Sequence, residues 1–294
     1  MPERLQDYLK RKLRQGDLGT LPHVLCDLLR VLDAPQSGAR DLERIISGDP
    51  AISARILRLA NSAMYGLPRK ISDLTHAIAL IGSTALRRTI LSTTAFDAYF
   101  QRGTVIYHRT DLWKQSLRSA CLARSLALRQ RKAPAESLFI AGLLHHLGYV
   151  VLDQFAHHIF TELLEVARGR GNIINLERTY LGTTHAEIGF WVAEVWHLPP
   201  VLAQAIRWHH EPFKAGEFML AAQIVAAADI LNANPGEVGL EWSEAESEAI
   251  MKALRLTDVA RQQVIGEAES EYREMEEYFR WDGRTGQPHR AAAV

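Results

Sequence analysis

Apolar positions recur along most of this chain at the spacing of helices, while alternation over the length of a strand is hard to find. In the first hundred residues, leucines within 21–32 form one apolar stripe, and Asp49 with Pro50 has the composition of a helix start. A short helix is expected over 73–81, ended by Gly82. The pattern predicts an all-α fold that opens with a compact helical bundle.

A polar interval near residue 105 separates this bundle from a second run of apolar helices. The periodicity predicts these helices at 112–130, 134–155, 158–168, 176–196, 200–209 and 218–232.

This pattern divides the chain into an N-terminal helical subdomain (1–107), a second helical subdomain (108–235) and a helical C-terminal extension (236–294) with a frayed tail. Within the extension, one apolar face should pack on the chain's own body, with homodimerisation as the alternative. Its residues are Ile265, Ala268, Tyr272, Met275 and Phe279.

Composition restricts the function classes. The chain is 47% hydrophobic and 23% charged, as is usual for a globular protein. Lys plus Arg equals Asp plus Glu at 34 each, so we expect no DNA partner. No uninterrupted apolar run approaches the roughly 18 to 20 residues of a membrane helix, so we expect a cytoplasmic protein without a membrane partner. Cys26 and Cys121 form no CxxC pattern and are interpreted as core residues.

Histidines dominate the remaining chemistry, because glycine-rich phosphate loops, nucleophile elbows and paired cysteines are absent from the sequence. Histidine and carboxylate side chains from several helices suit iron, manganese or zinc. A lone histidine on a helix flank is more often a core or capping residue. The polar residues within apolar helices of the second half are Gln115, His145, His146, His185, His209, His210 and Asp229.

Successive blocks of the chain resemble a known family. These blocks are SGDPAISARILRLANSAMYG, AIALIGSTALRRTIL, LWKQSLRSACLARSLA, LFIAGLLHHLGYVVL, THAEIGFWVAEVWHLPP and AIRWHHEP. Together they look like the HDOD family, the HD-related output domains of bacterial signalling proteins, and extend from about residue 21 to residue 232. The resemblance implies a helical N-terminal bundle packed on a second bundle similar to HD-type metal-dependent phosphohydrolases.

The motif of HD hydrolases is a histidine, an adjacent His-Asp pair and a distant aspartate around one or two metals. By resemblance, Gln115 stands at the first histidine, His145 matches the histidine of the pair, and His146 replaces its aspartate. Asp229 suits the final aspartate.

Three further histidines resemble ligands of the HD-GYP relatives that cleave cyclic di-GMP, although the GYP loop is missing. They are His185, His209 and His210.

The two departures from the HD motif, Gln115 and His146, argue against a dinuclear hydrolase. Metals in such sites lie about 3.5 to 4 Å apart and need a bridging carboxylate. A neutral His146 binds one ion through one nitrogen and cannot bridge, and the amide of Gln115 is a weak ligand for a transition metal. We therefore expect no cofactor, although a single iron, manganese or zinc ion held by His145, Asp229 and the three further histidines remains open. Otherwise the pair His145–His146 is expected to form hydrogen bonds to neighbouring helices.

Two functions follow as hypotheses. The first is a non-enzymatic signalling protein that acts through partner proteins, with the C-terminal helix, Trp242 and Trp281 as contact surfaces. The alternative is a metal-dependent phosphohydrolase, or a nucleotide or cyclic-dinucleotide sensor with Lys114 and Arg118 as phosphate contacts.

Overall fold

The computed structural model describes residues 4–16, 71–82, 106–131, 133–167, 173–233 and 242–278, two short strands after them, and single positions between 46 and 92. Several expectations lie outside the described residues. These are the apolar stripe at 21–32, the helix start at Asp49 and Pro50, and the burial of Cys26. Cys121, in contrast, is fully buried as expected.

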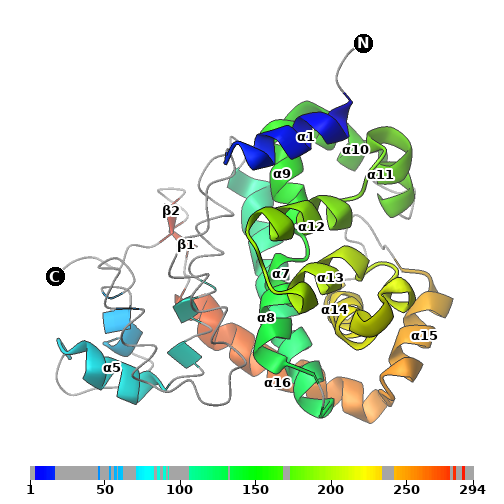
Figure 1. The fold of residues 1–294 in the computed structure, drawn as a ribbon. Helices are drawn as coiled ribbons and strands as arrows, with labels where there is room; N and C mark the ends of the chain where they lie inside the picture. Colours follow the sequence, from blue (N-terminus) through cyan, green and yellow to red (C-terminus); the bar gives the residue numbers. More distant parts are fainter. Residues whose placement is uncertain are drawn as a thin grey trace. The chain divides into compact units, whose positions relative to one another are not determined.

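The fold is all-α, which confirms the class predicted from the periodicity (Figure 1). A two-residue antiparallel pair, β1 (Trp281–Asp282) with β2 (Gln287–Pro288), follows the last described helix. The α-helices are α1 (Leu5–Arg14), α5 (Leu74–Ile81), α7 (Ile106–Arg129), α8 (Ala135–Leu144), α9 (Leu147–Phe155), α10 (His157–Ala167), α11 (Ile173–Leu181), α12 (His185–Val195), α13 (Pro200–Trp208), α14 (Met219–Asn232), α15 (Glu244–Ala253) and α16 (Asp258–Tyr278), with 3-10 turns at Pro212–Lys214 and Gly216–Phe218.

Contacts divide the chain into two compact units. One combines Met1–Thr20 with Ala95–Glu269, and the other combines Leu21–Thr94 with Ser270–Val294. Helix α16 therefore begins in the first unit and ends in the second. The first unit includes α1, which contacts α9 and α12, and also α15, which contacts α14. The subdomain boundaries expected at 107 and 235 stay a prediction.

The short helix expected at 73–81 is α5. The side chain of Asp73 accepts a hydrogen bond from the backbone N–H of His76, which caps the helix start. Gly82 ends it with a φ of 79°, a left-handed conformation that favours glycine.

Two helices expected to be continuous are each broken. The segment 134–155 ends as α8 at Leu144 and restarts as α9 at Leu147, with the two histidines at the corner. The segment 176–196 breaks between α11 and α12, because Gly182 has a φ of 70° and Thr184 caps the next helix. Apolar periodicity alone runs through both breaks, since buried residues lie on either side of each.

Helices α7, α8, α12, α13 and α14 form the core of the first unit, where α7 contacts α8 most extensively. Its interior is apolar, with Leu117, Phe139, Ile188 and Ile224 no more than 1% exposed. The segment 135–155 has the length and composition of a membrane-spanning helix, which we had expected of no segment, but 89% of that window is buried within the fold. Its apolarity is thus accounted for by its place in this core.

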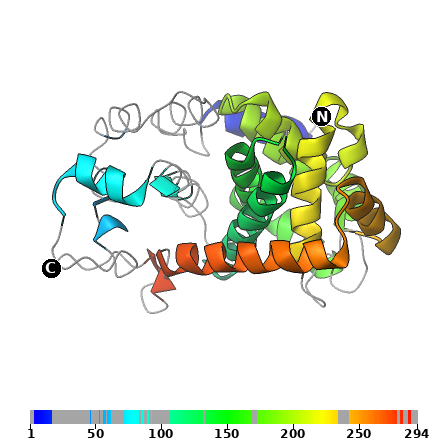
Figure 2. The same ribbon diagram turned by 90° about the horizontal axis from the view of Figure 1, so that it is seen from below.

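The C-terminal helix α16, the orange helix of Figure 2, contacts α7 through side chains in the first unit. Arg118 of α7 forms a 2.7 Å ion pair with Glu269, and the hydroxyl of Ser125 donates to Glu267. On the apolar face of α16, Val264, Ala268 and Tyr272 are buried, Ile265 and Met275 are half-buried, and Phe279 lies outside the described residues. The chain therefore covers much of this face itself, and dimerisation through it stays a prediction.

Candidate metal centre

Two histidines of the candidate centre occupy equivalent positions at helix ends. His145 caps the C-terminus of α8 and His209 caps the C-terminus of α13. In each, ring atom Nδ1 lies 2.6 Å from a carbonyl oxygen three residues earlier, Gly142 O or Ile206 O. Carbonyls in the last turn of a helix lack backbone partners and only accept hydrogen bonds, so Nδ1 must carry the proton. In its neutral form, each ring therefore has its lone pair on Nε2.

His185 is oriented by hydrogen bonds at the start of a helix. Thr184 and Glu187 form a capping box that makes His185 the first residue of α12. Its backbone N–H, which has no partner within the helix, donates to Glu177 Oε2 at 2.9 Å, and its Nδ1 lies 2.9 Å from Glu177 Oε1. Both side chains are fully buried. Glu177 thus fixes the ring of His185 with Nε2 directed away from the carboxylate, as carboxylates behind metal-bound histidines do.

A glycine lets α9 approach this helix start. A Cβ atom at Gly148 would lie 2.0 Å from the carbonyl oxygen of His185, far inside any allowed contact. Tyr149, the next residue, stacks on the His185 ring at a centroid distance of 4.1 Å. The close approach brings the ring of His146 to within 5.3 Å of the ring of His185.

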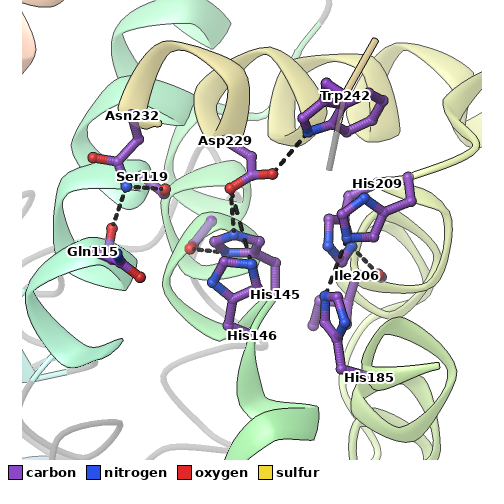
Figure 3. Close-up of polar contacts among 12 residues, drawn as sticks. Gln115, Ser119, His145, His146, His185, Ile206, His209, Asp229, Asn232 and Trp242 are labelled. Atoms are coloured by element: carbon purple, nitrogen blue, oxygen red, sulfur yellow. Dashed lines mark hydrogen bonds and ion pairs between the residues drawn. The ribbon is translucent and has the colours of Figure 1, made fainter. Parts of the chain in front are cut away.

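Asp229 of α14 supplies a carboxylate beside these rings (Figure 3). Its Oδ1 lies 3.5 Å from His145 Nε2 and 3.9 Å from His146 Nε2, longer than ordinary hydrogen bonds. Its Oδ2 accepts a 2.9 Å hydrogen bond from the indole Nε1–H of Trp242. Although burial alone would raise the pKa of Asp229, that pKa lies well below the ordinary range, and the hydrogen bond from Trp242 favours the ionised carboxylate. Asp229 is therefore an anion facing imidazole nitrogens.

Several buried ring nitrogens lack hydrogen-bond partners among the described residues. They include Nε2 of His145, Nε2 of His209 and both nitrogens of His146. A buried polar atom without a hydrogen-bond partner lowers the stability of the fold by about 1 to 3 kcal/mol. Several such atoms in one cluster therefore indicate that a ligand binds there. These residues fit a transition metal ion, because neutral imidazoles and a carboxylate are its usual ligands.

Two groups of three histidines could hold an ion, namely His145, His146 and His209, or His185, His209 and His210, with ligand atoms within 4.8 Å in each. Both groups need His209, whose only available lone pair is on Nε2. One nitrogen lone pair binds one ion, so the two groups cannot both hold a metal through all three histidines.

The two ends of the cluster differ in how their nitrogens are satisfied. Nε2 of His185 and Nε2 of His210 lie 3.1 Å apart and form a hydrogen bond with each other. We call His185, His210 and Glu177 the Glu177 side, and we call His145, His146, His209 and Asp229 the Asp229 side. On the Asp229 side, ring nitrogens without hydrogen-bond partners lie beside the carboxylate of Asp229, so this side is the better candidate binding site for an ion.

Burial keeps His146 and His209 of the Asp229 side neutral. Desolvation, with the neighbouring His145, lowers the pKa of His146 well below its ordinary value. Desolvation, with the neighbouring His210, lowers the pKa of His209 in the same way. Neutral rings are the form that binds metal.

The structure gathers most of the residues singled out from the sequence. His145, His146, His185, His209, His210 and Asp229 form one cluster, whereas Gln115 lies apart from the rings in Figure 3. There, Asn232 donates to the backbone carbonyl of Gln115 and to the hydroxyl of Ser119, both at 3.0 Å.

The two residues expected to contact phosphate lie on α7. Lys114 is exposed, and Arg118 pairs with Glu269 as described above. Their role as phosphate contacts stays a prediction.

Two expectations about side chains need correction. His145 and His146 were expected to form hydrogen bonds to neighbouring helices, yet Nδ1 of His145 donates within its own helix and His146 has no hydrogen-bond partner among the described residues. The corner between α8 and α9 turns both rings toward Asp229, which explains the difference. Trp242, expected on a contact surface, is half-buried and donates to Asp229.

Sequence reasoning missed two residues of the site. Glu177 lies at an apolar position of α11, on the buried stripe with Ile173, Ile174 and Leu181, and a charged residue on such a stripe was the signal. Trp242 directly precedes the Ser243–Glu246 capping box of α15, but nothing local indicates that it reaches Asp229.

Comparisons with known proteins agree with the fold. A crystal structure of an HDOD domain protein of unknown function from Geobacter sulfurreducens is similar, with a TM-score of 0.72 and 24% identity, covering 94% of this chain and 98% of that one. A candidate phosphohydrolase from Shewanella amazonensis SB2B has a TM-score of 0.67 and 22% identity, covering 92% of this chain and 97% of that one. At these identities, the likeness concerns the fold.

A sequence relative and a family model carry the assignment further. An uncharacterised protein of Treponema pallidum (strain Nichols) is 30% identical over 224 residues, which make up 74% of this chain but only 42% of that protein. The model of the HDOD domain matches residues 18–212, more than half of the 294 residues. The chain belongs to the HDOD family.

Proposed function

We propose that this chain is a regulatory protein of bacterial signal transduction, which acts through contacts with partner proteins in the cytoplasm and binds one transition metal ion without hydrolysing a substrate. The ion would be iron, manganese or zinc. A candidate signal transduction protein from Marinobacter aquaeolei VT8 shares the fold, with a TM-score of 0.71 and 21% identity over 95% of this chain and 61% of that one.

The observation that carries this proposal is the distribution of carboxylates in the described part of the cluster. Asp229 is the carboxylate that faces the unpartnered ring nitrogens, and one of its oxygens already accepts from Trp242. Glu177 is engaged behind His185 and does not face the Asp229 side. A dinuclear hydrolase needs a carboxylate that bridges two ions, and His146 occupies the position where the resemblance expects it.

The residues that would hold the ion are His145, His209 and Asp229, with His146 as a further donor. When bound, a divalent ion would supply Lewis acidity and a strong local positive charge. The protein's own groups hold the imidazoles in one tautomer, through Gly142 O and Ile206 O, and keep Asp229 ionised. A centre built in this way stabilises one arrangement of α8, α13 and α14, which suits a domain that transmits a signal by contact.

The test combines metal content with hydrolysis. Protein purified without chelator should contain about one transition metal ion per chain by plasma mass spectrometry. His145→Ala should lose the ion, while His158→Ala, an exposed histidine, should keep it. With manganese or iron added, no hydrolysis of bis(p-nitrophenyl) phosphate or cyclic di-GMP is expected.

Hydrolysis by the wild-type protein that disappears in Asp229→Ala would contradict the proposal and favour the phosphohydrolase. Cyclic di-GMP or nucleotide binding without cleavage would favour a sensor. The double variant Gln115→His, His146→Asp addresses the origin of the site. Metal-dependent phosphodiesterase activity in this variant alone would identify the wild-type centre as a hydrolase site that lost its carboxylate.

A further inference from the structure

We propose that Trp242 is a positioning residue of the metal centre, which restricts Asp229 to one coordinating oxygen and so favours zinc over manganese. This inference rests on the proposed metal binding. Trp242 lies beyond residues 18–212, the part that the family model matches, so the C-terminal segment would complete the centre.

The two oxygens of Asp229 face different partners. Oδ1 faces the histidines, 3.5 Å from His145 Nε2 and 3.9 Å from His146 Nε2. Oδ2 faces Trp242 Nε1 at 2.9 Å, a normal hydrogen-bond length. The carboxylate therefore presents one oxygen to the ring nitrogens and keeps the other on the indole (Figure 3).

The indole is held in place independently of Asp229. Its ring stacks on His210 at a centroid distance of 5.3 Å and an interplanar angle of 29°. The next residue, Ser243, is the N-cap of α15, where it exchanges hydrogen bonds with Glu246 in a capping box. Helix α15 in turn contacts α14, the helix that carries Asp229, and buries Ile250 and Met251. The stacking on His210 and the capped start of α15 therefore both fix the position of Trp242.

With Oδ2 held by Trp242, Asp229 would offer a bound ion only one oxygen donor. Oδ1 of Asp229, which lies beside His145 and His146, would add a fourth donor to the group His145, His146 and His209, and four is the number that zinc prefers in a tetrahedral site. Manganese prefers six ligands that are mainly oxygen, so a bidentate carboxylate favours it. For Asp229 to bind through both oxygens, Oδ2 would have to turn toward the ion, and the hydrogen bond from Trp242 opposes that rotation. Because an indole nitrogen only donates, it cannot itself replace that oxygen as a ligand.

The experiment compares Trp242→Phe with the wild-type protein. Phenylalanine retains an aromatic ring beside His210 and removes the N–H donor together with part of the indole ring, a loss of size that the control variant shares. Trp191→Phe is the matched control, since Trp191 lies under the ammonium group of Lys10 and outside the histidine cluster. Dissociation constants for zinc and manganese are measured on full-length protein by competition with a chromophoric chelator, and the absorption of bound cobalt(II) reports the coordination number.

In Trp242→Phe, zinc affinity should fall about 10- to 100-fold, the usual effect of removing a group that orients a ligand, while manganese affinity should fall less or rise. The cobalt spectrum should lose intensity as the coordination number increases. Trp191→Phe should retain the wild-type constants and spectrum. An unchanged ratio of the zinc and manganese constants in Trp242→Phe, or an equal loss of both, would overturn the proposal.

A second measurement needs no variant. In wild-type protein labelled with nitrogen-15 at tryptophan, the indole proton of Trp242, assigned from its contacts with His210, should stay protected from exchange when zinc binds. Rapid exchange in the zinc form would overturn the proposal even if Trp242→Phe does not fold. If the wild-type protein binds neither zinc nor manganese, the proposed function itself fails. If it binds them and Trp242→Phe does not alter the preference, only the role of Trp242 fails.

Discussion

The Asp229 side and the Glu177 side of the cluster use the same residue types to different ends. On the Glu177 side, Nε2 of His185 and Nε2 of His210 form a hydrogen bond with each other, and Glu177 accepts from both the ring and the backbone N–H of His185. On the Asp229 side, the ring nitrogens that face the carboxylate have no hydrogen-bond partners among the described residues. The difference shows that the histidines of one cluster need not all be metal ligands. Satisfied nitrogens stabilise the fold, and unsatisfied ones mark where a ligand belongs.

Removing a ring from the Glu177 side should produce the largest effect on stability. In His185→Ala, the fully buried carboxylate of Glu177 loses its imidazole partner, so the free energy of unfolding should fall by about 3 kcal/mol or more. His145→Ala removes a ring whose Nε2 is unpartnered, so the loss should be smaller. Urea unfolding of both variants in the presence of chelator measures the difference. Equal losses would mean that the two sides do not differ as described.

Metal should stabilise the protein through the Asp229 side. At a zinc concentration about 100 times the dissociation constant, the free energy of unfolding should rise by about 2.7 kcal/mol, because only the folded chain offers the assembled site. His209→Ala should abolish this rise, since His209 belongs to both possible ligand groups. His210→Ala should retain most of it. Thermal unfolding with and without zinc measures both, and an equal loss in the two variants would contradict the assignment of the ion to the Asp229 side.

Acidification should have the smallest effect of the three. The pKa values of His146 and His209 lie below the ordinary value because of burial, so these rings stay neutral in the folded chain and become protonated first in the unfolded chain. Their contribution to stability is present above about pH 6.5 and is lost as the pH falls below it, by up to about 1.4 kcal/mol per group and pH unit. Asp229 adds to the loss only below about pH 4, the ordinary range of aspartate.

Urea unfolding in chelator between pH 7 and pH 5 measures this dependence. His146→Leu should reduce the slope by about one proton. His158→Ala should not alter the slope, because its side chain is 84% exposed. A wild-type slope that matches that of His146→Leu would show that His146 does not titrate as its burial indicates.

The sequence predicted the ligands better than their surroundings. His145, His209 and Asp229 could be singled out because each is a polar residue in an apolar helical segment. The breaks at His145–His146 and at Thr184 were not predicted, because apolar spacing continues across them. Glu177 could have been found from its place on a buried stripe, whereas the contact of Trp242 with Asp229 has no local signal.

By itself, the sequence determined that the fold is all-α and which side chains could bind a metal, because helical spacing and ligand chemistry are properties of neighbouring residues and of residue types. Tertiary structure decided which of those side chains have a lone pair to offer. That choice depends on contacts between separate helices, such as Trp242 with Asp229, His210 with His185, and Glu177 with the start of α12. No spacing in the chain specifies these contacts, since they arise only when the helices pack.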